Sequence, residues 1–177
     1  MTTSKRRPAF PDGIDDTSIQ PVAPWRRHAS PLGLVVFGLV VVLALTGVLG
    51  HERSWAAEGG GIRLEIHAPE VIRNGEFFEL RVRVAAETDV DELVIGIEES
   101  LWEDVTVNTM IPAAADETSA DGEVRFTFAE LADGTEWLLK VDLQVNPDIV
   151  AGNDGTITVY DGATPLTSAD LTITVLP

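Results

Sequence analysis

The chain contains no cysteine, and only three of its 177 residues are histidine. The lack of cysteine excludes disulfide bonds and removes the thiolate ligands that zinc and copper sites commonly use. The histidines, His28, His51 and His67, are far apart in the sequence. A Ser-His-Asp hydrolase would depend on His67, yet the chain has no GxSxG motif and no phosphate-binding glycine loop. The sequence therefore predicts a protein that is not an enzyme and binds no cofactor.

Basic residues are also scarce, with 12 Lys and Arg against 29 Asp and Glu. Residues 1–31 hold five basic and three acidic side chains, whereas residues 51–177 hold seven basic and 26 acidic ones. Phosphate groups need Lys and Arg to neutralise them, so the strongly acidic C-terminal part argues against nucleic acid as a partner and against docking of this part onto an anionic lipid surface. Within residues 85–136, 15 acidic side chains accompany a single basic one, Arg125. This stretch is interpreted as a solvated face, or alternatively as a surface for a basic partner or for cations.

One long apolar run is present, from Leu32 to Gly50, without a charged residue. As an α-helix it would be roughly 28 Å long, close to the hydrocarbon thickness of a bilayer. Trp25 and Trp55 flank the run, at positions where indole rings favour the membrane interface. Ala44, Gly47 and Gly50 place small residues on one side of this helix, which would allow close approach of a second helix. The run predicts a single transmembrane helix over residues 32–50.

A cleaved signal peptide is the alternative to a retained anchor. Ser54-Trp55-Ala56 has the small-x-small pattern of a cleavage site before Ala57. However, the apolar run is longer than a typical signal-peptide core, and 31 residues precede it. The retained anchor is therefore favoured. The basic N-terminal flank predicts a cytoplasmic N-terminus, which places the C-terminal part in the periplasm or outside the cell.

The rest of the chain divides by composition. Residues 1–31 are rich in proline and lack apolar periodicity, which predicts an arm without regular structure. Residues 51–61, "HERSWAAEGGG", have the composition of a flexible spacer. Residues 62–177 are long enough to form one ordinary domain with its own core.

Apolar and polar residues alternate through most of residues 62–177, which is typical of β-strands with one buried face. The alternation predicts about eight strands, around residues 62–67, 77–86, 93–97, 105–107, 124–128, 137–145, 157–159 and 171–175. The turn-forming sequences "RNGE", "ADGE", "ADGT", "GNDGT" and "YDGATP" separate them. No amphipathic helix interrupts the pattern. The predicted fold class is all-β, an immunoglobulin-like antiparallel sandwich of two sheets preceded by the transmembrane helix.

The stretch "APEVIRNGEFFELRVRVAAE" resembles the opening hairpin of bacterial extracytoplasmic immunoglobulin-like domains. The whole layout, with "VNTMIP", "LQVNP", "TVYDGATPL" and "LTITVLP", resembles a family of bacterial single-pass membrane proteins with a C-terminal domain of this kind. The resemblance implies an accessory protein of the cell envelope that is partnered with another integral membrane protein. It brings no catalytic residues with it.

A few residues are candidates for binding. Trp102 lies among acidic residues (Glu98, Glu99, Glu103 and Asp104) and is interpreted as a cap on the core, with a sugar-binding platform as the alternative. Phe77 is predicted to face outward, where it could contact a partner. Oxygen ligands for calcium are present on two predicted loops, as Asp116, Glu117, Asp121 and Glu123 and as Asp148, Asn153 and Asp154. These loops lack EF-hand spacing, and Asx-Gly pairs form turns in their own right.

The sequence thus favours a membrane-anchored, non-enzymatic envelope protein that presents an acidic β-sandwich as an accessory or protein-interaction module. A calcium- or glycan-binding surface domain is the alternative.

Overall fold

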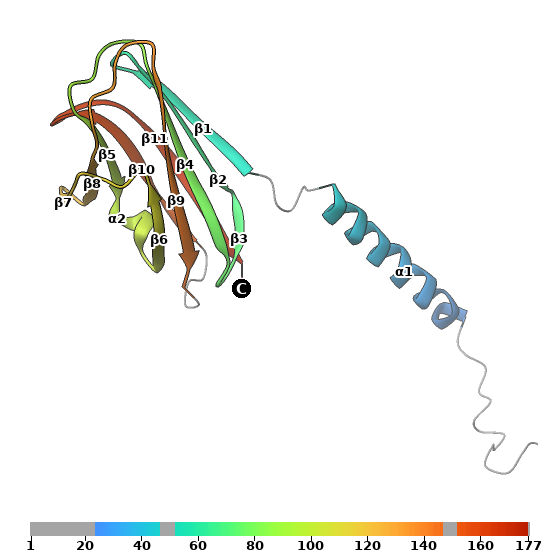
Figure 1. The fold of residues 1–177 in the computed structure, drawn as a ribbon. Helices are drawn as coiled ribbons and strands as arrows, with labels where there is room; N and C mark the ends of the chain where they lie inside the picture. The colour runs from blue at the N-terminus through green and yellow to red at the C-terminus, as the bar shows by residue number, and fades with distance from the viewer. Residues whose placement is uncertain (1–23, 47–51, 147–151, 177) are drawn as a thin grey trace, which may run out of the picture. The chain divides into compact units, whose positions relative to one another are not determined.

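In a computed structural model, the structure describes residues 24–46, 52–146 and 152–176. The chain forms two compact units, Met1–Thr46 and Gly47–Pro177. The first contains α1 (Pro24–Leu45) and the second a β-sandwich (Figure 1). The elements of the sandwich are β1 (Glu52–Gly59), β2 (Ile62–Pro69), β3 (Val71–Arg73), β4 (Phe77–Ala86), β5 (Leu93–Glu98), α2 (Glu99–Trp102), β6 (Val105–Ile111), β7 (Asp116–Ala120), β8 (Glu123–Thr127), β9 (Glu136–Val145), β10 (Asn153–Asp161) and β11 (Thr164–Leu176).

Helix α1 begins inside the arm that was predicted to lack regular structure over residues 1–31, so that prediction is wrong for Pro24–Pro31. Proline is well tolerated at the first helical position, where its missing N–H would have no partner in any case, and Pro24 occupies that position. The large apolar side chains from Leu32 to Leu45 are exposed. Among the described residues, no helix has both the length and the apolar character that crossing a membrane requires. The last part of the predicted span, residues 47–50, lies outside the described residues.

The spacer predicted over residues 51–61 is wrong, because Glu52–Gly59 form strand β1. This strand pairs with β2 in antiparallel register, from Glu52 opposite Pro69 to Gly59 opposite Ile62. Gly60 and Gly61 join the two strands with φ angles of 56° and 73°, which are the positive values that a tight hairpin turn requires. The consecutive glycines therefore close a hairpin, and the first strand of the sandwich that the structure describes begins at Glu52 rather than at residue 62.

The strands form two sheets, and both are antiparallel except at one pair. The five-stranded sheet has the order β1-β2-β4-β9-β6, and the six-stranded sheet has the order β3-β11-β10-β5-β8-β7 (Figure 1). Short β3 leaves the sheet that contains β2 and pairs in parallel with β11. The described residues contain eleven strands rather than about eight, since β1, β3 and β7 were not predicted. The predicted all-β sandwich of two sheets is confirmed, and it is mostly antiparallel, with the β3–β11 pair as the exception.

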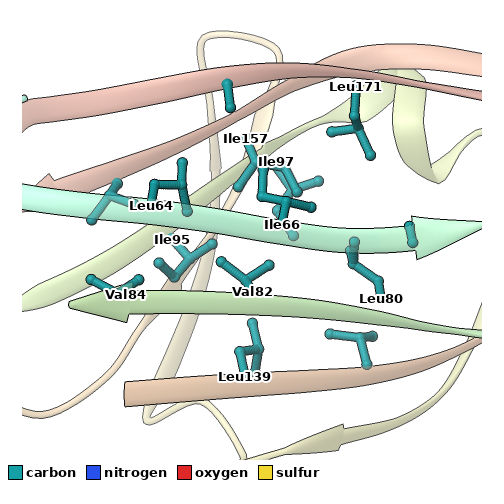
Figure 2. Packing of buried hydrophobic residues seen from close by; sticks show 14 of the residues in the cluster. Leu64, Ile66, Leu80, Val82, Val84, Ile95, Ile97, Leu139, Ile157 and Leu171 are labelled. Carbon is teal, nitrogen blue, oxygen red and sulfur yellow. The ribbon is translucent and has the colours of Figure 1, made fainter. Parts of the chain in front are cut away.

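The core lies between the two sheets. Figure 2 shows Leu64, Val82 and Leu139 of the five-stranded sheet close to apolar residues of the other sheet, including Ile95, Ile157 and Leu171. The alternation predicted for these strands is confirmed, because every second residue over 62–66, 80–84 and 139–145 is buried. In contrast, the "GNDGT" segment, which was predicted to be a turn, supplies the first residues of β10.

Candidate binding groove at the open edge of the sandwich

The two lateral edges of the sandwich differ. At one edge, β1 packs against β11 so closely that a Cβ atom on Gly59 would lie 2.9 Å from the carbonyl oxygen of Leu166. A Cβ atom on Gly60 would likewise lie 2.9 Å from the Cα atom of Leu166. At the other edge, β6 ends the five-stranded sheet and β7 ends the six-stranded sheet. The hairpin end of β1 therefore lies in close contact with β11 on the first side, and a groove opens between the last strands on the second side.

This groove, called here the β6–β7 groove, has a volume of about 560 Å³. Its apolar surface comes from the inner faces of the two edge strands, from the connection between them and from one ring of β8. The lining residues are Val107, Met110, Ala113, Ala114, Ala115, Asp116, Glu117 and Phe126. Six of the eight lining residues are thus apolar, and the other two place carboxylates along the β7 side.

A β-bulge in β6 shapes one wall of the groove. Val107 pairs with Leu143 and Thr109 with Asp142, so Asn108 is an extra residue in the ladder. Successive side chains in a regular strand alternate between faces, so Val107 and Met110, which are three positions apart, would face opposite sides. The extra residue lets both of them face inward. Val107 remains 44% exposed although it faces inward, since no further strand of the described chain covers it.

The opposite wall is β7, whose register with β8 is regular from Asp116 to Ala120. Glu117 is opposite Phe126, a buried residue, so both side chains are on the inward face of the sheet. Glu117 is nevertheless exposed, because β7 is the last strand of its sheet. In the part of the chain that the structure describes, Glu117 has no ion pair and no side-chain hydrogen bond. A carboxylate without a partner therefore stands on the inner face at the rim of an apolar groove.

The candidate residues around Trp102 are part of the fold. The Trp102 ring is half-buried against the core and meets Phe126 edge-to-face, with 6.0 Å between ring centroids. Glu98 accepts a hydrogen bond from the backbone N–H of Thr156 at 2.9 Å. Asn153 donates its side-chain N–H to the backbone carbonyl of Glu103 at 2.7 Å. The interpretation of Trp102 as a cap on the core is supported, and an exposed sugar platform is not.

The structure does not bring the proposed calcium ligands together. Glu123 accepts hydrogen bonds from the Tyr160 hydroxyl at 2.6 Å and from Arg125 Nε at 3.1 Å. Asp121 pairs with Arg125 at 3.2 Å. Among the described residues, no group of three or more acidic or histidine side chains is arranged to hold a metal ion. Asp148 lies outside the described residues.

Phe77 and His67 lie on the outer face of the five-stranded sheet. Phe77 is 67% exposed, as predicted, and it lines a second, shallower depression of about 340 Å³ together with Asn108 and Asp142. His67 Nε2 is 3.6 Å from a carboxylate oxygen of Glu65. His67 therefore lies among the charged side chains of this face, opposite Ser54 of β1.

The charged side chains on the outer faces of the two sheets make different contacts. On the five-stranded sheet, basic side chains alternate with acidic ones in ion pairs that include Arg63–Glu58 at 2.6 Å, Arg83–Glu136 at 3.4 Å and Lys140–Glu79 at 3.7 Å. On the six-stranded sheet, the Arg125 guanidinium lies 4.8 Å from the centre of the Tyr160 ring. Burial raises the pKa of the Tyr160 hydroxyl, which keeps it neutral as a donor to Glu123. The single basic residue of the 85–136 stretch is therefore already neutralised by its neighbours.

No protein-family model and no curated protein matches the chain. Among solved structures, it is similar to CaCohA2 from Clostridium acetobutylicum, with 19% identity, coverage of 66% of this chain and 92% of the other, and a TM-score of 0.44. It is also similar to a CARDB domain from Pyrococcus furiosus, with 15% identity, coverage of 68% and 98%, and a TM-score of 0.41. The chitin-binding domain of a chitinase from Pyrococcus furiosus gives 14% identity, coverage of 64% and 99%, and a TM-score of 0.36. These scores mark a loose likeness of fold.

Proposed function

We propose that the β-sandwich is a non-enzymatic protein-interaction module that holds an extended segment of another protein in the β6–β7 groove. The observation that supports this proposal most directly is the groove between two edge strands, which is lined by apolar side chains and two carboxylates. Edge strands offer unpaired backbone N–H and C=O groups, and an added strand can bond to them while its side chains fill the adjacent space. The groove volume is within the range of ordinary ligand sites.

We also propose that residues 32–50 anchor this module in a membrane, with the N-terminus in the cytoplasm and the sandwich on the other side. The support is the uncharged apolar run, the basic flank before it, and the exposure of the apolar side chains of α1. A tethered module meets an integral membrane partner at high local concentration, so even a weak contact in the groove becomes effective. The protein would then act as an accessory subunit of that partner.

The position of β1 bears on whether the anchor is retained. Cleavage before Ala57 would remove Glu52–Ala56 from β1, together with the half-buried Trp55. The remaining domain would lose most of the strand that pairs with β2. This loss favours an anchor that stays attached to the sandwich.

The interaction is tested by filling the groove. Ala113 is exposed at the groove and Ala163 is exposed in the turn between β10 and β11, so tryptophan at either position should leave the fold intact. After crosslinking in cells and purification in mild detergent, Ala113→Trp should reduce recovery of the specific membrane partner at least about tenfold, because it occupies the space of the bound segment. Ala163→Trp should recover it like the wild type. Equal recovery with both variants would contradict the proposed use of the groove.

The anchor is tested by following the N-terminus. We expect mass spectrometry of the membrane fraction to find peptides from residues 1–31 in the same chains as the sandwich. A reporter that is active only outside the cytoplasm should work when fused after Pro177. A mature protein that starts at Ala57 would show that the anchor is removed.

A further inference from the structure

The Glu117 carboxylate restricts the charge of a segment that can bind in the groove. Its side chain is on the inward face of β7, opposite Phe126, and in the described part of the chain no basic group neutralises it. A strand added to β7 would remove water from this carboxylate. Burying a charge without a partner is unfavourable, and natural proteins use inward-pointing charges on edge strands to prevent unwanted pairing. An uncharged strand is therefore a poor occupant.

A second copy of the chain is a poor occupant as well. Pairing β7 with β7 of another copy would bring two Glu117 carboxylates to the same groove, and like charges on paired strands repel. The surrounding stretch from residue 85 to 136 strengthens this repulsion, since its only basic residue, Arg125, already pairs with Glu123 and Asp121.

Of the two edges, β7 is the better template for an added strand. Its pairing with β8 is regular over its whole length, whereas the bulge at Asn108 interrupts the ladder of β6. Bulges locally disrupt pairing and increase the twist of an edge, which makes the addition of a strand there less favourable. A strand on β7 would extend the six-stranded sheet and face Val107 and Met110 of β6 across the groove.

We infer that the partner of the β6–β7 groove is a basic segment, which adds to β7 as a strand and places a Lys or Arg side chain beside Glu117. This inference rests on the proposed function of the groove. The apolar stem of a Lys or Arg fits the apolar walls while its charged head reaches the carboxylate. Because side chains of a strand alternate, apolar residues two positions before and after the basic residue also face the groove and contact Phe126 and Met110. The Glu117 carboxylate thus disfavours uncharged or acidic strands at the edge of β7 and favours strands that carry a Lys or Arg side chain.

The test uses the full-length protein in mild detergent and short fluorescent peptides in which valine, a central residue and valine are separated by threonines. The central residue is Lys in one peptide and Glu in the other. Fluorescence anisotropy should give a Kd at least about tenfold lower for the Lys peptide, since opposite charges attract in the groove and like charges repel. The preference should weaken as salt is added.

Variants of Glu117 test whether its carboxylate causes the preference for the Lys peptide over the Glu peptide. Glu117→Gln should reduce the difference between the two peptides to about threefold or less, and Glu117→Lys should reverse it. Glu130→Gln is the matched control, because it makes the same change in a separate depression that Asp89 and Asp91 also line, and it should keep the wild-type preference. Bound Lys peptide should slow amide hydrogen exchange in residues 116–120 and not in residues 105–111.

Equal affinity for the two peptides, or a preference that survives Glu117→Lys, would overturn the inference. The proposed function is tested separately, by the recovery of the membrane partner. It is contradicted if Ala113→Trp leaves that recovery unchanged. If Ala113→Trp abolishes recovery while the Lys and Glu peptides bind alike, the groove is the binding site and its selection of basic segments is wrong.

Discussion

Replacing Val141 by aspartate is expected to unfold the β-sandwich. Val141 is fully buried in the centre of β9, with Leu80 on one side and Met110 on the other. A carboxylate at this position would be charged and without a partner, or would have to take up a proton to stay buried, and either outcome costs free energy. We expect a loss of roughly 4 kcal/mol or more in the free energy of unfolding, comparable to most of the stability of a small domain. Circular dichroism during urea denaturation should show no cooperative transition.

The control for this variant is the next residue in the same strand. Asp142 faces outward and is exposed. Replacing it by asparagine removes a charge from the surface and should change the free energy of unfolding by no more than about 0.5 kcal/mol. Similar behaviour of Val141→Asp and Asp142→Asn would mean that the faces of β9 are wrongly assigned.

The second large effect is expected from removing β1. A chain that starts at Glu52 should fold cooperatively, and a chain that starts at Glu58 should be less stable by roughly 3 kcal/mol or more. The shorter chain lacks the pairing with β2 and the half-buried Trp55, whose position on β1 is opposite the buried Ile66. Urea denaturation midpoints of the two chains, measured side by side, give the difference.

Point variants separate the packing of Trp55 from the length of the chain. Trp55→Ala in the chain that starts at Glu52 should lose about 2 kcal/mol, since the ring is only partly buried. Ser54 is adjacent, exposed and on the other face of β1, so Ser54→Ala should be nearly neutral. If the chain that starts at Glu58 is as stable as the longer one, residues 52–57 are a spacer after all.

The strands that the sequence predicts correctly are those in which alternation is carried by large side chains. In β4 and β9, Val, Leu and Phe alternate with charged residues, and each segment is long enough to make the period of two clear. The residues of β1 are smaller, and the glycines that follow it resemble a linker in composition. In β1, Trp55 and Ala57 are the apolar residues that face inward. The glycines before the next strand are typical of a flexible spacer as well as of a hairpin, so the sequence alone did not indicate a strand.

The groove was harder to predict. From the sequence, Glu117 is a candidate calcium ligand on a loop. Its position in the groove depends on its pairing with Phe126, which only the register of β7 and β8 reveals. In "DETSA" no large apolar residue marks one face, so the pattern did not indicate a strand. Phe77 was predicted correctly as an outward-facing residue, because its neighbours in β4 alternate without interruption.

The bulge in β6 means that the groove depends on the pairing register of that strand as well as on the identity of its residues. If Asn108 paired with β9 like its neighbours, the alternation would continue unbroken after Val107, so Met110 would turn outward and Ile111 would turn inward. If Asn108 were removed, Val107, Thr109 and Met110 would form a regular ladder opposite Leu143, Asp142 and Val141, and the same side chains would face the groove. The bulge therefore lets β6 carry one extra residue while Val107 and Met110 both stay on the groove wall.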